Sequence, residues 1–414
     1  MTTVKIPKIL LPKKDIDKSK WSVIACDQFT SQADYWEEVE KYVGASPSTL
    51  RLIYPEVYLE REDKQARIEA INANMSKYLK KGLFEEFEGF ILVDRTMNDG
   101  RHRLGLMISV DLEDYEYTEK NDALVKATEK TVVDRLPPRI EIRKGACLEL
   151  PHIMMLMDDR SQKIIEKLYE SRDFLEKAYD FELNMNGGRV QGYKVTNCAQ
   201  ILEEIEGLLK EDVLVEKYGS SKPILFAVGD GNHSLATAKE CWKNIKKTLT
   251  SAQRQKHPAR YALCELVNIH DKSLDFEPIH RVVFGVDKDF INFMHDRLAE
   301  LDGKEHVKVV FEDTIYYWSV CDNPSDAIAD IQSLMDEYAL THPEMVIDYI
   351  HGDEHLLKVG ADGHGVAVFM PKLQKDALFD YVVRRGALPR KSFSMGHAED
   401  KRYYLECRKI VSDL

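Results

Sequence analysis

Two tight-turn signals, each lying between apolar segments, most limit how this chain can fold. Asn98-Asp99-Gly100 separates the strand-like runs 90–94 and 104–111, and Asn186-Gly187-Gly188 lies inside the run 181–195. Glycine after Asp or Asn suits the positive φ of a hairpin turn, so both segments are expected to form antiparallel hairpins. Hairpins mixed with helices interrupt a strand–helix–strand rhythm, and the chain is therefore expected to be α+β, with mixed sheets and packed helices, rather than doubly wound.

Helical periodicity appears at irregular intervals between these strands. It predicts helices over 31–42, 62–81, 160–177, 197–218, 232–248, 287–301, 326–338 and 375–383. Short apolar runs predict further strands at 222–228, 261–269, 307–311, 315–320 and 365–370. No repeat or long flexible linker marks a boundary. We expect an N-terminal helical and edge segment (1–85), a core (86–302) and a C-terminal α+β segment (303–414).

The composition argues against several classes of protein. Hydrophobic residues make up 44% of the 414 residues, which is enough for an ordinary globular core. The formal net charge of -13 argues against a nucleic-acid partner, which requires a large basic surface. The seven cysteines include no CxxC pair, so neither a zinc site nor a disulfide framework is expected. No signal peptide or membrane-spanning run is apparent. We therefore expect a cytoplasmic protein with no membrane partner.

The stretch from Val228 to Ser234 is the strongest candidate for a functional site. An apolar strand is followed by Gly229-Asp230-Gly231, and a helix is expected from Asn232. Glycines permit a tight turn, and the start of a helix presents amides and a partial positive charge that bind anions, phosphate included. Asp230 could bind a metal ion or act as a base, and His233 could donate to a phosphate. The spacing alone fits equally well an ordinary strand–helix turn in which the aspartate caps the helix.

These residues resemble a known family. Asp230-Gly231-Asn232-His233-Ser234 is similar to the Asp-Gly-x-His-Arg motif of the family catalogued as domain of unknown function number ten-fifteen. Ser234 stands where that motif has arginine, so a bidentate phosphate clamp is missing at this position. Other segments resemble the family's remaining motifs in the same order along the chain: residues 21–28, Thr128-Glu129-Lys130-Thr131 with Asp134-Arg135, Pro278-Ile279-His280-Arg281, and Leu388-Pro389-Arg390-Lys391-Ser392.

The resemblance implies a fold and an activity. It implies a ParB/sulfiredoxin-like core with additional N- and C-terminal elaborations, in a superfamily that acts on nucleotides and phosphoryl groups and includes free serine kinases. We therefore expect a nucleotide-dependent phosphotransferase that uses ATP or ADP with Mg²⁺ and acts on a small hydroxylated metabolite such as L-serine. Its partners would be the nucleotide and this small-molecule substrate, and a homodimer is left open.

The resemblance also implies roles for individual residues. Asp230, His233 and Glu129 are expected to be catalytic: Asp230 binds Mg²⁺ or orients the acceptor, His233 contacts the transferring phosphoryl group, and Glu129 is the base. Positive charge and backbone donors are what phosphoryl transfer chiefly requires. The residues expected to supply them are Gly229, Gly231, Asn232, Ser234, Arg135, His280, Arg281, Lys391 and Ser392. Taken without the resemblance, Glu129 fits a solvated helix face, and the basic residues fit structural ion pairs.

Two other functions remain open at this point. One is a nucleotide-binding regulatory protein with slow or no hydrolysis, which the serine at position 234 favours. The other is a phosphatase that acts on phosphoserine with water as the acceptor. Cys26, in an apolar run, is expected to be a buried and inert thiol. The cluster His351-Gly352-Asp353-Glu354-His355 is expected to be a turn rather than a metal site.

Overall fold

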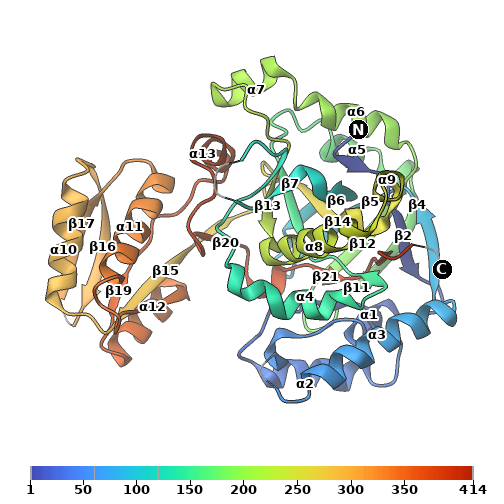
Figure 1. Ribbon diagram of the computed structural model, residues 1–414, viewed down its shortest axis with the longest axis horizontal. Coiled ribbons are helices and arrows are strands. Elements are labelled where there is room, and N and C mark those ends of the chain that lie inside the picture. Colours follow the sequence, from blue (N-terminus) through green and yellow to red (C-terminus); the bar gives the residue numbers. More distant parts are fainter. Residues whose placement is uncertain (1, 60, 119–120, 313, 413–414) are drawn as a thin grey trace. The chain divides into compact units, whose positions relative to one another are not determined.

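The computed structural model describes residues 2–59, 61–118, 121–312 and 314–412. Its residues form two compact units (Figure 1). Unit 1 draws on Met1–Ala127, Thr131–Leu274 and His397–Leu414, and unit 2 on Thr128–Lys130 and Asp275–Gly396. The chain thus leaves unit 1 and returns to it with its last segment. The three-segment division expected from the sequence stays a prediction.

Unit 1 is built on a mixed sheet. Its described residues contribute ten strands in the spatial order β11–β12–β5–β6–β14–β10–β13–β8–β7, with β1 beside β6. β10 runs parallel to β14 and antiparallel to β13, and β8 runs parallel to both β13 and β7. The strands are β1 (Val4–Lys5), β5 (Phe90–Thr96), β6 (His102–Asp111), β7 (Tyr115–Glu116), β8 (Val125–Ala127), β10 (Met154–Met157), β11 (Glu176–Glu182), β12 (Arg189–Val195), β13 (Phe226–Asp230) and β14 (Tyr261–Asn268).

Both expected hairpins are present in this sheet. β5 and β6 pair antiparallel across a turn in which Gly100 has a φ of 84°. β11 and β12 pair antiparallel across a turn in which Asn186 and Gly188 have φ values of 57° and 77°. β12 also pairs with β5, so the two hairpins lie side by side. The mixture of these hairpins with parallel pairs and helices confirms the expected mixed α and β class.

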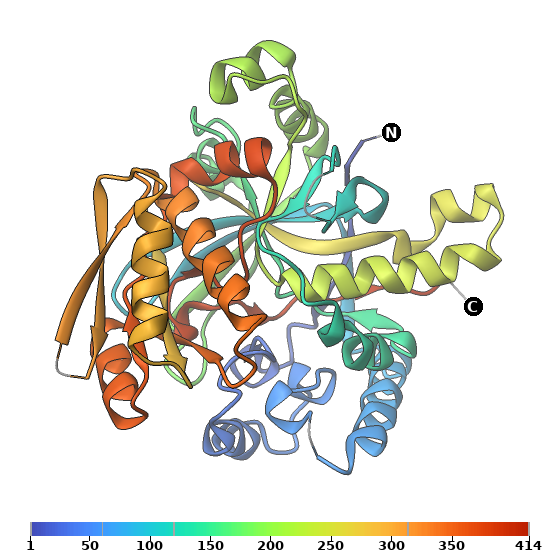
Figure 2. The same cartoon turned by 60° about the vertical axis from the view of Figure 1, so that its left-hand side comes forward.

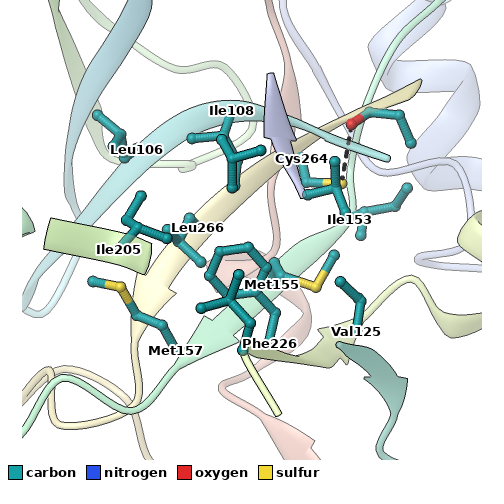
Figure 3. Packing of buried hydrophobic residues seen from close by; sticks show 14 of the residues in the cluster. Leu106, Ile108, Val125, Ile153, Met155, Met157, Ile205, Phe226, Cys264 and Leu266 are labelled. Atoms are coloured by element: carbon teal, nitrogen blue, oxygen red, sulfur yellow. Dashed lines mark hydrogen bonds between the residues drawn. The ribbon is translucent and has the colours of Figure 1, made fainter. Parts of the chain in front are cut away.

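The two faces of this sheet bury different sets of side chains. Because side chains alternate along a strand, Leu106 and Ile108 of β6 join one apolar cluster while Met107, between them, joins another. The first cluster takes in Trp242 and Ile205 from helices and the Phe226 ring from β13, which Figure 3 shows beside Met155 and Leu266. The helices that contribute to it are α5 (Ile165–Glu170), α6 (Cys198–Gly207) and α8 (Asn232–Ile245).

The opposite face is covered by the N-terminal part of the chain. Trp36 and Val39 of α2 (Ala33–Val43) and Ile68 and Ile71 of α3 (Lys64–Lys80) belong to the second cluster. Figures 1 and 2 both show these helices next to α4 (Leu136–Lys144). The remaining elements of unit 1 are α1 (Lys18–Trp21), α7 (Glu211–Tyr218), α9 (Ser251–Lys256) and the short paired strands β2 (Lys8–Pro12), β3 (Val23–Ile24), β4 (Phe84–Glu88), β9 (Leu148–Glu149), β21 (Tyr403–Tyr404) and β22 (Arg408–Lys409).

Two expected helices of unit 1 are wrong in extent. In place of one helix over 160–177, the chain forms the short α5, a 3₁₀ turn at Arg172–Phe174, and then β11. Only Glu176 and Lys177 of β11 fall within the expected helix, and at these two residues pairing with β12 outweighs the helical pattern. The helix expected over 197–218 is divided between α6 and α7. No helix in the described part of the chain has the length and apolar character needed to cross a membrane.

Unit 2 is a second mixed α and β unit. Its main sheet has the order β17–β16–β19–β15–β18, with β20 on β15. Val282 and Ala367 pack with Leu356 of α12 on one face, while α10 packs against both β17 and α11. The elements are β15 (Phe276–Phe284), α10 (Lys288–Ala299), β16 (Glu305–Phe311), β17 (Thr314–Val320), α11 (Pro324–Ala339), β18 (Val346–His351), α12 (Asp353–Asp362), β19 (Val366–Val368), α13 (Leu378–Arg385) and β20 (Phe393–Met395).

Candidate functional site

The candidate turn joins β13 to α8 without an intervening loop. β13 ends at Asp230, and Gly231 occupies the N-cap position of α8 with a φ of 78°. A Cβ atom at Gly231 would lie 3.0 Å from the Cα of Ile153, next to β10. Both the backbone conformation and this close neighbour therefore require glycine. The result is a helix whose first turn begins at the end of a buried strand, as the sequence predicted.

Asp230 is held ionised by a lysine from the C-terminal segment. Its Oδ2 accepts a hydrogen bond from Lys401 Nζ at 2.9 Å, and its Oδ1 accepts the Gly231 amide at 2.8 Å. Burial acts to raise the pKa of Asp230, but the Lys401 ammonium and the Gly231 amide outweigh it and hold that pKa below its usual value. The turn therefore carries a carboxylate and an ammonium together. Lys401 was not identified from the sequence, because it lies 171 positions away from Asp230.

A series of hydrogen bonds runs from Ser234 to side chains in the interior of unit 1. Ser234 Oγ lies 3.0 Å from His152 Nε2, and His152 Nδ1 lies 2.6 Å from the Tyr404 hydroxyl. Tyr404 donates to Cys26 Sγ over 3.1 Å. With the Tyr404 hydrogen directed at sulfur, Nδ1 of His152 carries a hydrogen and donates to Tyr404, and Nε2 accepts from Ser234. Asp27 Oδ2 lies 3.7 Å from the same Nε2.

Two groups of this hydrogen-bonded network, the Tyr404 phenol and the Cys26 thiol, stay uncharged. Burial raises the pKa of Tyr404 well above its usual value, so the phenol stays protonated. Burial, together with the nearby charge of Asp27, raises the pKa of the Cys26 thiol. The raised pKa fits the inert thiol expected from the sequence, although Cys26 is half-buried rather than buried. His152 and Tyr404 were missed in the sequence, where neither belongs to a motif; for Asp27 the signal was its position just after a strand-like run.

The remaining turn and helix residues have defined surroundings. Asn232 Oδ1 is buried and accepts no hydrogen bond from the described residues. The backbone carbonyl of His233 accepts the Thr237 hydroxyl at 2.7 Å. Arg135 is exposed at the start of α4, and α4 packs against α8. Unit 1 therefore holds the whole turn and Arg135.

The other expected site residues belong to unit 2. Glu129 Oε1 accepts the amides of Ser392 and Phe393 at 2.9 and 3.4 Å, and its Oε2 accepts the Lys391 amide at 3.1 Å. The Ser392 hydroxyl donates to the Pro389 carbonyl at 2.7 Å. Burial raises the pKa of Glu129, although Lys391 and these amides oppose the shift. The carboxylate thus anchors the loop 389–393 through three backbone amides.

Arg281 anchors the same loop through its backbone carbonyls. Its Nη1 donates to the Lys391 carbonyl at 3.0 Å, and its Nη2 donates to the Arg390 carbonyl at 3.4 Å. The guanidinium is buried and lies 4.6 Å from the centre of the Tyr349 ring. Burial lowers the pKa of Arg281 to about 10. Loop 389–393 is therefore held by a buried cation and a half-buried carboxylate, while the Lys391 side chain is exposed.

His280 and the 351–355 cluster meet within unit 2. His280 Nδ1 accepts the Met370 amide at 3.0 Å, so Nε2 carries the hydrogen and donates to Asp353 Oδ1 at 2.9 Å. Burial lowers the pKa of His280 despite the nearby carboxylate. Gly352 has a φ of 83° and precedes α12, as expected for a turn. Among the described residues, no three His, Cys, Asp or Glu side chains are placed to hold a metal ion.

The motifs extend over most of the chain, and so does a family match. The family model described as a protein of unknown function (DUF1015) matches residues 10–410. The chain belongs to this family. No curated protein matches the sequence. The family assignment therefore confirms the resemblance read from the motifs, but it brings no known activity with it.

Solved structures show only distant similarity. A free serine kinase mutant in complex with ADP has 10% identity and a TM-score of 0.38, over 74% of this chain and 92% of that chain. A free serine kinase in complex with AMP has 12% identity and a TM-score of 0.35, over 74% and 91%. A conserved hypothetical protein from Pyrococcus furiosus has 10% identity and a TM-score of 0.37, over 74% and 95%. Similarity this weak assigns neither a fold nor a function to this chain.

Proposed function

We propose that this protein is a cytoplasmic, nucleotide-dependent phosphotransferase that acts on a small hydroxylated metabolite. The observation that carries the proposal is the Asp230–Lys401 pair at the start of α8, where Nζ and Oδ2 are 2.9 Å apart. A carboxylate and an ammonium at a helix N-terminus supply what phosphoryl transfer needs, which is positive charge and a place for a metal ion. A ParB/sulfiredoxin-like core for unit 1 is part of this proposal.

The proposed phosphate position is the first turn of α8. The amides of Asn232 and Ser234 lie in this turn, where a helix has no carbonyl of its own to accept them. Their direction and the helix dipole favour an anion. Gly231 leaves the approach without a side chain, and Gly229 lies two residues before it on β13. Lys401 lies within contact of the same turn and would take over the part of the arginine that the family motif has at position 234.

A magnesium ion fits this proposal through a single protein ligand, Asp230. Mg²⁺ in phosphotransferases is commonly held by one or two carboxylates, with the phosphates and water as its other ligands. Asp230 is the residue that would hold it here, since its carboxylate is ionised at the end of β13. When bound, the ion would supply positive charge that neutralises the phosphates of ATP or ADP. His233 is the second residue of α8, and it is proposed to contact the transferred phosphoryl group.

The unit 2 residues enter the proposal with adjusted roles. Glu129 and Arg281 are proposed to position loop 389–393, because both contact its backbone. Ser392 and His280 are proposed to support the loop and its sheet. The expected nucleotide contact of Lys391, which is exposed on that loop, stays a prediction. Arg135 is proposed to reach the phosphates from α4. The earlier assignment of Glu129 as the general base stays a prediction, and a Glu129→Gln variant in the assay described next tests it.

The assay measures nucleotide consumption with and without an alcohol acceptor, L-serine included, in the presence of Mg²⁺. Acceptor-dependent turnover that Asp230→Asn abolishes supports the phosphotransferase. The matched control is Asp212→Asn, which neutralises an exposed aspartate in the first turn of α7 and should keep full activity. Phosphate release from phosphoserine without nucleotide would instead identify a phosphatase. Nucleotide binding without turnover, for any acceptor, would contradict the proposal and favour a regulatory role.

A further inference from the structure

A cavity in unit 1 reaches the side chains at the base of the candidate turn. It has a volume of about 150 Å³, and Ser234, Thr237 and His152 form part of its wall. The rest of its wall is mostly apolar and comes from the N-terminal segment, α3, α4 and β9. Its apolar lining includes Leu52, Ile53, Ile71, Met75, Ile142 and Leu148. The cavity thus has a polar end at His152 and an apolar body.

The charged groups in this wall are already paired with one another. Arg139 donates to Glu56, and Arg143 donates to Glu149 at 2.5 Å. Burial raises the pKa of Glu56, although Arg139 opposes the shift. A ligand in the cavity would therefore meet ion pairs rather than an isolated charge. Such a wall does not suit a zwitterion, because a buried ammonium and carboxylate each require a charged or strongly hydrogen-bonding partner.

We infer that this cavity binds the acceptor of the proposed phosphotransferase, and that the acceptor is an alcohol with an uncharged apolar body. The inference rests on the proposed function, and it narrows the substrate class. An apolar cavity of about 150 Å³ accommodates a molecule the size of benzene. An aromatic ring or a branched aliphatic group fills this space, whereas the hydroxymethyl side chain of L-serine leaves most of it empty.

The hydroxyl of this acceptor takes the place of the Ser234 hydroxyl at His152 Nε2. Nε2 faces Ser234 Oγ at 3.0 Å and has a lone pair when Tyr404 fixes the hydrogen on Nδ1. The acceptor oxygen then forms a bond to the terminal phosphorus of the nucleotide. The bond from that phosphorus to the leaving oxygen breaks, its electron pair stays on the nucleotide product, and the acceptor proton passes to Nε2. Ser234 belongs to the first turn of α8, so both reactants meet at the same helix end.

The test measures binding of benzyl alcohol to the full chain by isothermal titration calorimetry, in the absence of nucleotide. We expect measurable binding of benzyl alcohol and none of L-serine. Ala146→Phe places a ring in the cavity wall and should weaken benzyl alcohol at least ~10-fold, because a filled site has no room for the ligand. Ala178→Phe is the matched control, since Ala178 is equally half-buried in the same apolar cluster but does not line the cavity; its affinity should stay within ~2-fold of wild type.

Asp230→Asn separates this inference from the proposed function. Asp230 does not line the cavity, so this variant should bind benzyl alcohol like the wild type even if its turnover is lost. Binding that Ala146→Phe weakens, with no phosphate transfer to any alcohol, would retain the cavity as a ligand site and refute the phosphotransferase. Transfer to L-serine, with no binding or phosphorylation of benzyl alcohol, would refute the acceptor class alone. Equal losses of benzyl alcohol affinity in Ala146→Phe and Ala178→Phe would also overturn the inference that the cavity binds the acceptor.

Discussion

Lys401 and Arg402 are consecutive residues, yet they form two very different ion pairs in unit 1. Lys401 reaches Asp230 at the end of β13, and the side chains of this pair are 12% and 25% exposed. Arg402 reaches Glu265 in the middle of β14, and those side chains are 5% and 1% exposed. One segment of the chain therefore supplies a cation to an accessible strand end and a cation to a sealed interior.

The difference lies in how completely each carboxylate is surrounded. Arg402 also donates to Glu406 and to the Pro151 carbonyl, and Tyr179 donates to Glu406 at 2.5 Å. Burial acts to raise the pKa of Glu265, but Arg402 and its neighbours hold it below its usual value. The Asp230 pair has a single cation beside a helix N-terminus, an arrangement in which a bound anion can take part. Solvent access and the neighbouring helix end, rather than charge alone, distinguish a candidate site from a structural pair.

The largest effect is expected on stability, from Arg402→Met. The substitution leaves two buried carboxylates without their shared cation, and breaking such a buried pair costs about 3–5 kcal/mol. Urea unfolding followed by circular dichroism would measure the loss. Lys401→Met is the control, since a partly exposed pair contributes at most ~1 kcal/mol. Equal losses in the two variants would show that the two pairs do not differ as described.

Lys401→Met is expected to have a large effect on activity, although its effect on stability is small. Removing one preorganised charge from a phosphoryl-transfer site lowers kcat by roughly 10²-fold. The nucleotide-consumption assay would measure this, with the thermal midpoint recorded in parallel. Lys243→Met is a matched control, because Lys243 also pairs with a single carboxylate, that of Glu240 at 2.7 Å, but lies further along α8. If Lys401→Met kept full activity, the ammonium would have no place in the proposed site.

Sequence reasoning identified the turn but not its partners, and the reason is physical. The strand, Gly231 and the start of α8 are local features, so glycine and apolar patterning predict them. Lys401 and His152 reach the turn only through tertiary folding, when the last segment returns to unit 1. The fold shows the same division. Both hairpins followed from turn residues, whereas the helix expected over 160–177 was too long, because its last two residues pair with β12 as the start of β11. Neither the sequence nor the family motifs indicated that Glu129 binds backbone amides.

Gly231→Ala should sharpen the comparison by disturbing the accessible strand end without changing a charge. A positive φ costs a residue with a Cβ about 1 kcal/mol, and the contact at 3.0 Å with Ile153 Cα adds to this. Gly219→Ala is the control: its φ is 61°, and nothing lies within 4 Å of the added Cβ. Urea unfolding should show the larger loss for Gly231→Ala, together with reduced nucleotide binding. Identical losses would mean that the contact with β10 has no consequence.

The smallest effect is expected in the acid dependence of stability. The pKa of Asp230 is lowered in the folded protein from its ordinary value of 3.8, so the folded state favours the ionised carboxylate. Its contribution is therefore fully present above that value and is lost as the pH falls through the lowered pKa. The stability of wild type relative to Asp230→Asn should be constant from about pH 7 to pH 5 and should shrink below about pH 4, by less than ~1 kcal/mol in total.

Urea titrations of both proteins across this range would measure the difference. Lys401→Met sharpens the result, because without the ammonium only His152 and the Gly231 amide would oppose burial, and the pKa of Asp230 would rise. In the Lys401→Met background, the stability contributed by Asp230 should then begin to fall at a higher pH than in the wild type. A difference between wild type and Asp230→Asn that stayed constant to the lowest pH would mean that Lys401 does not hold the carboxylate ionised. The accessible pair would then lose the electrostatic feature that sets it apart from an ordinary strand end.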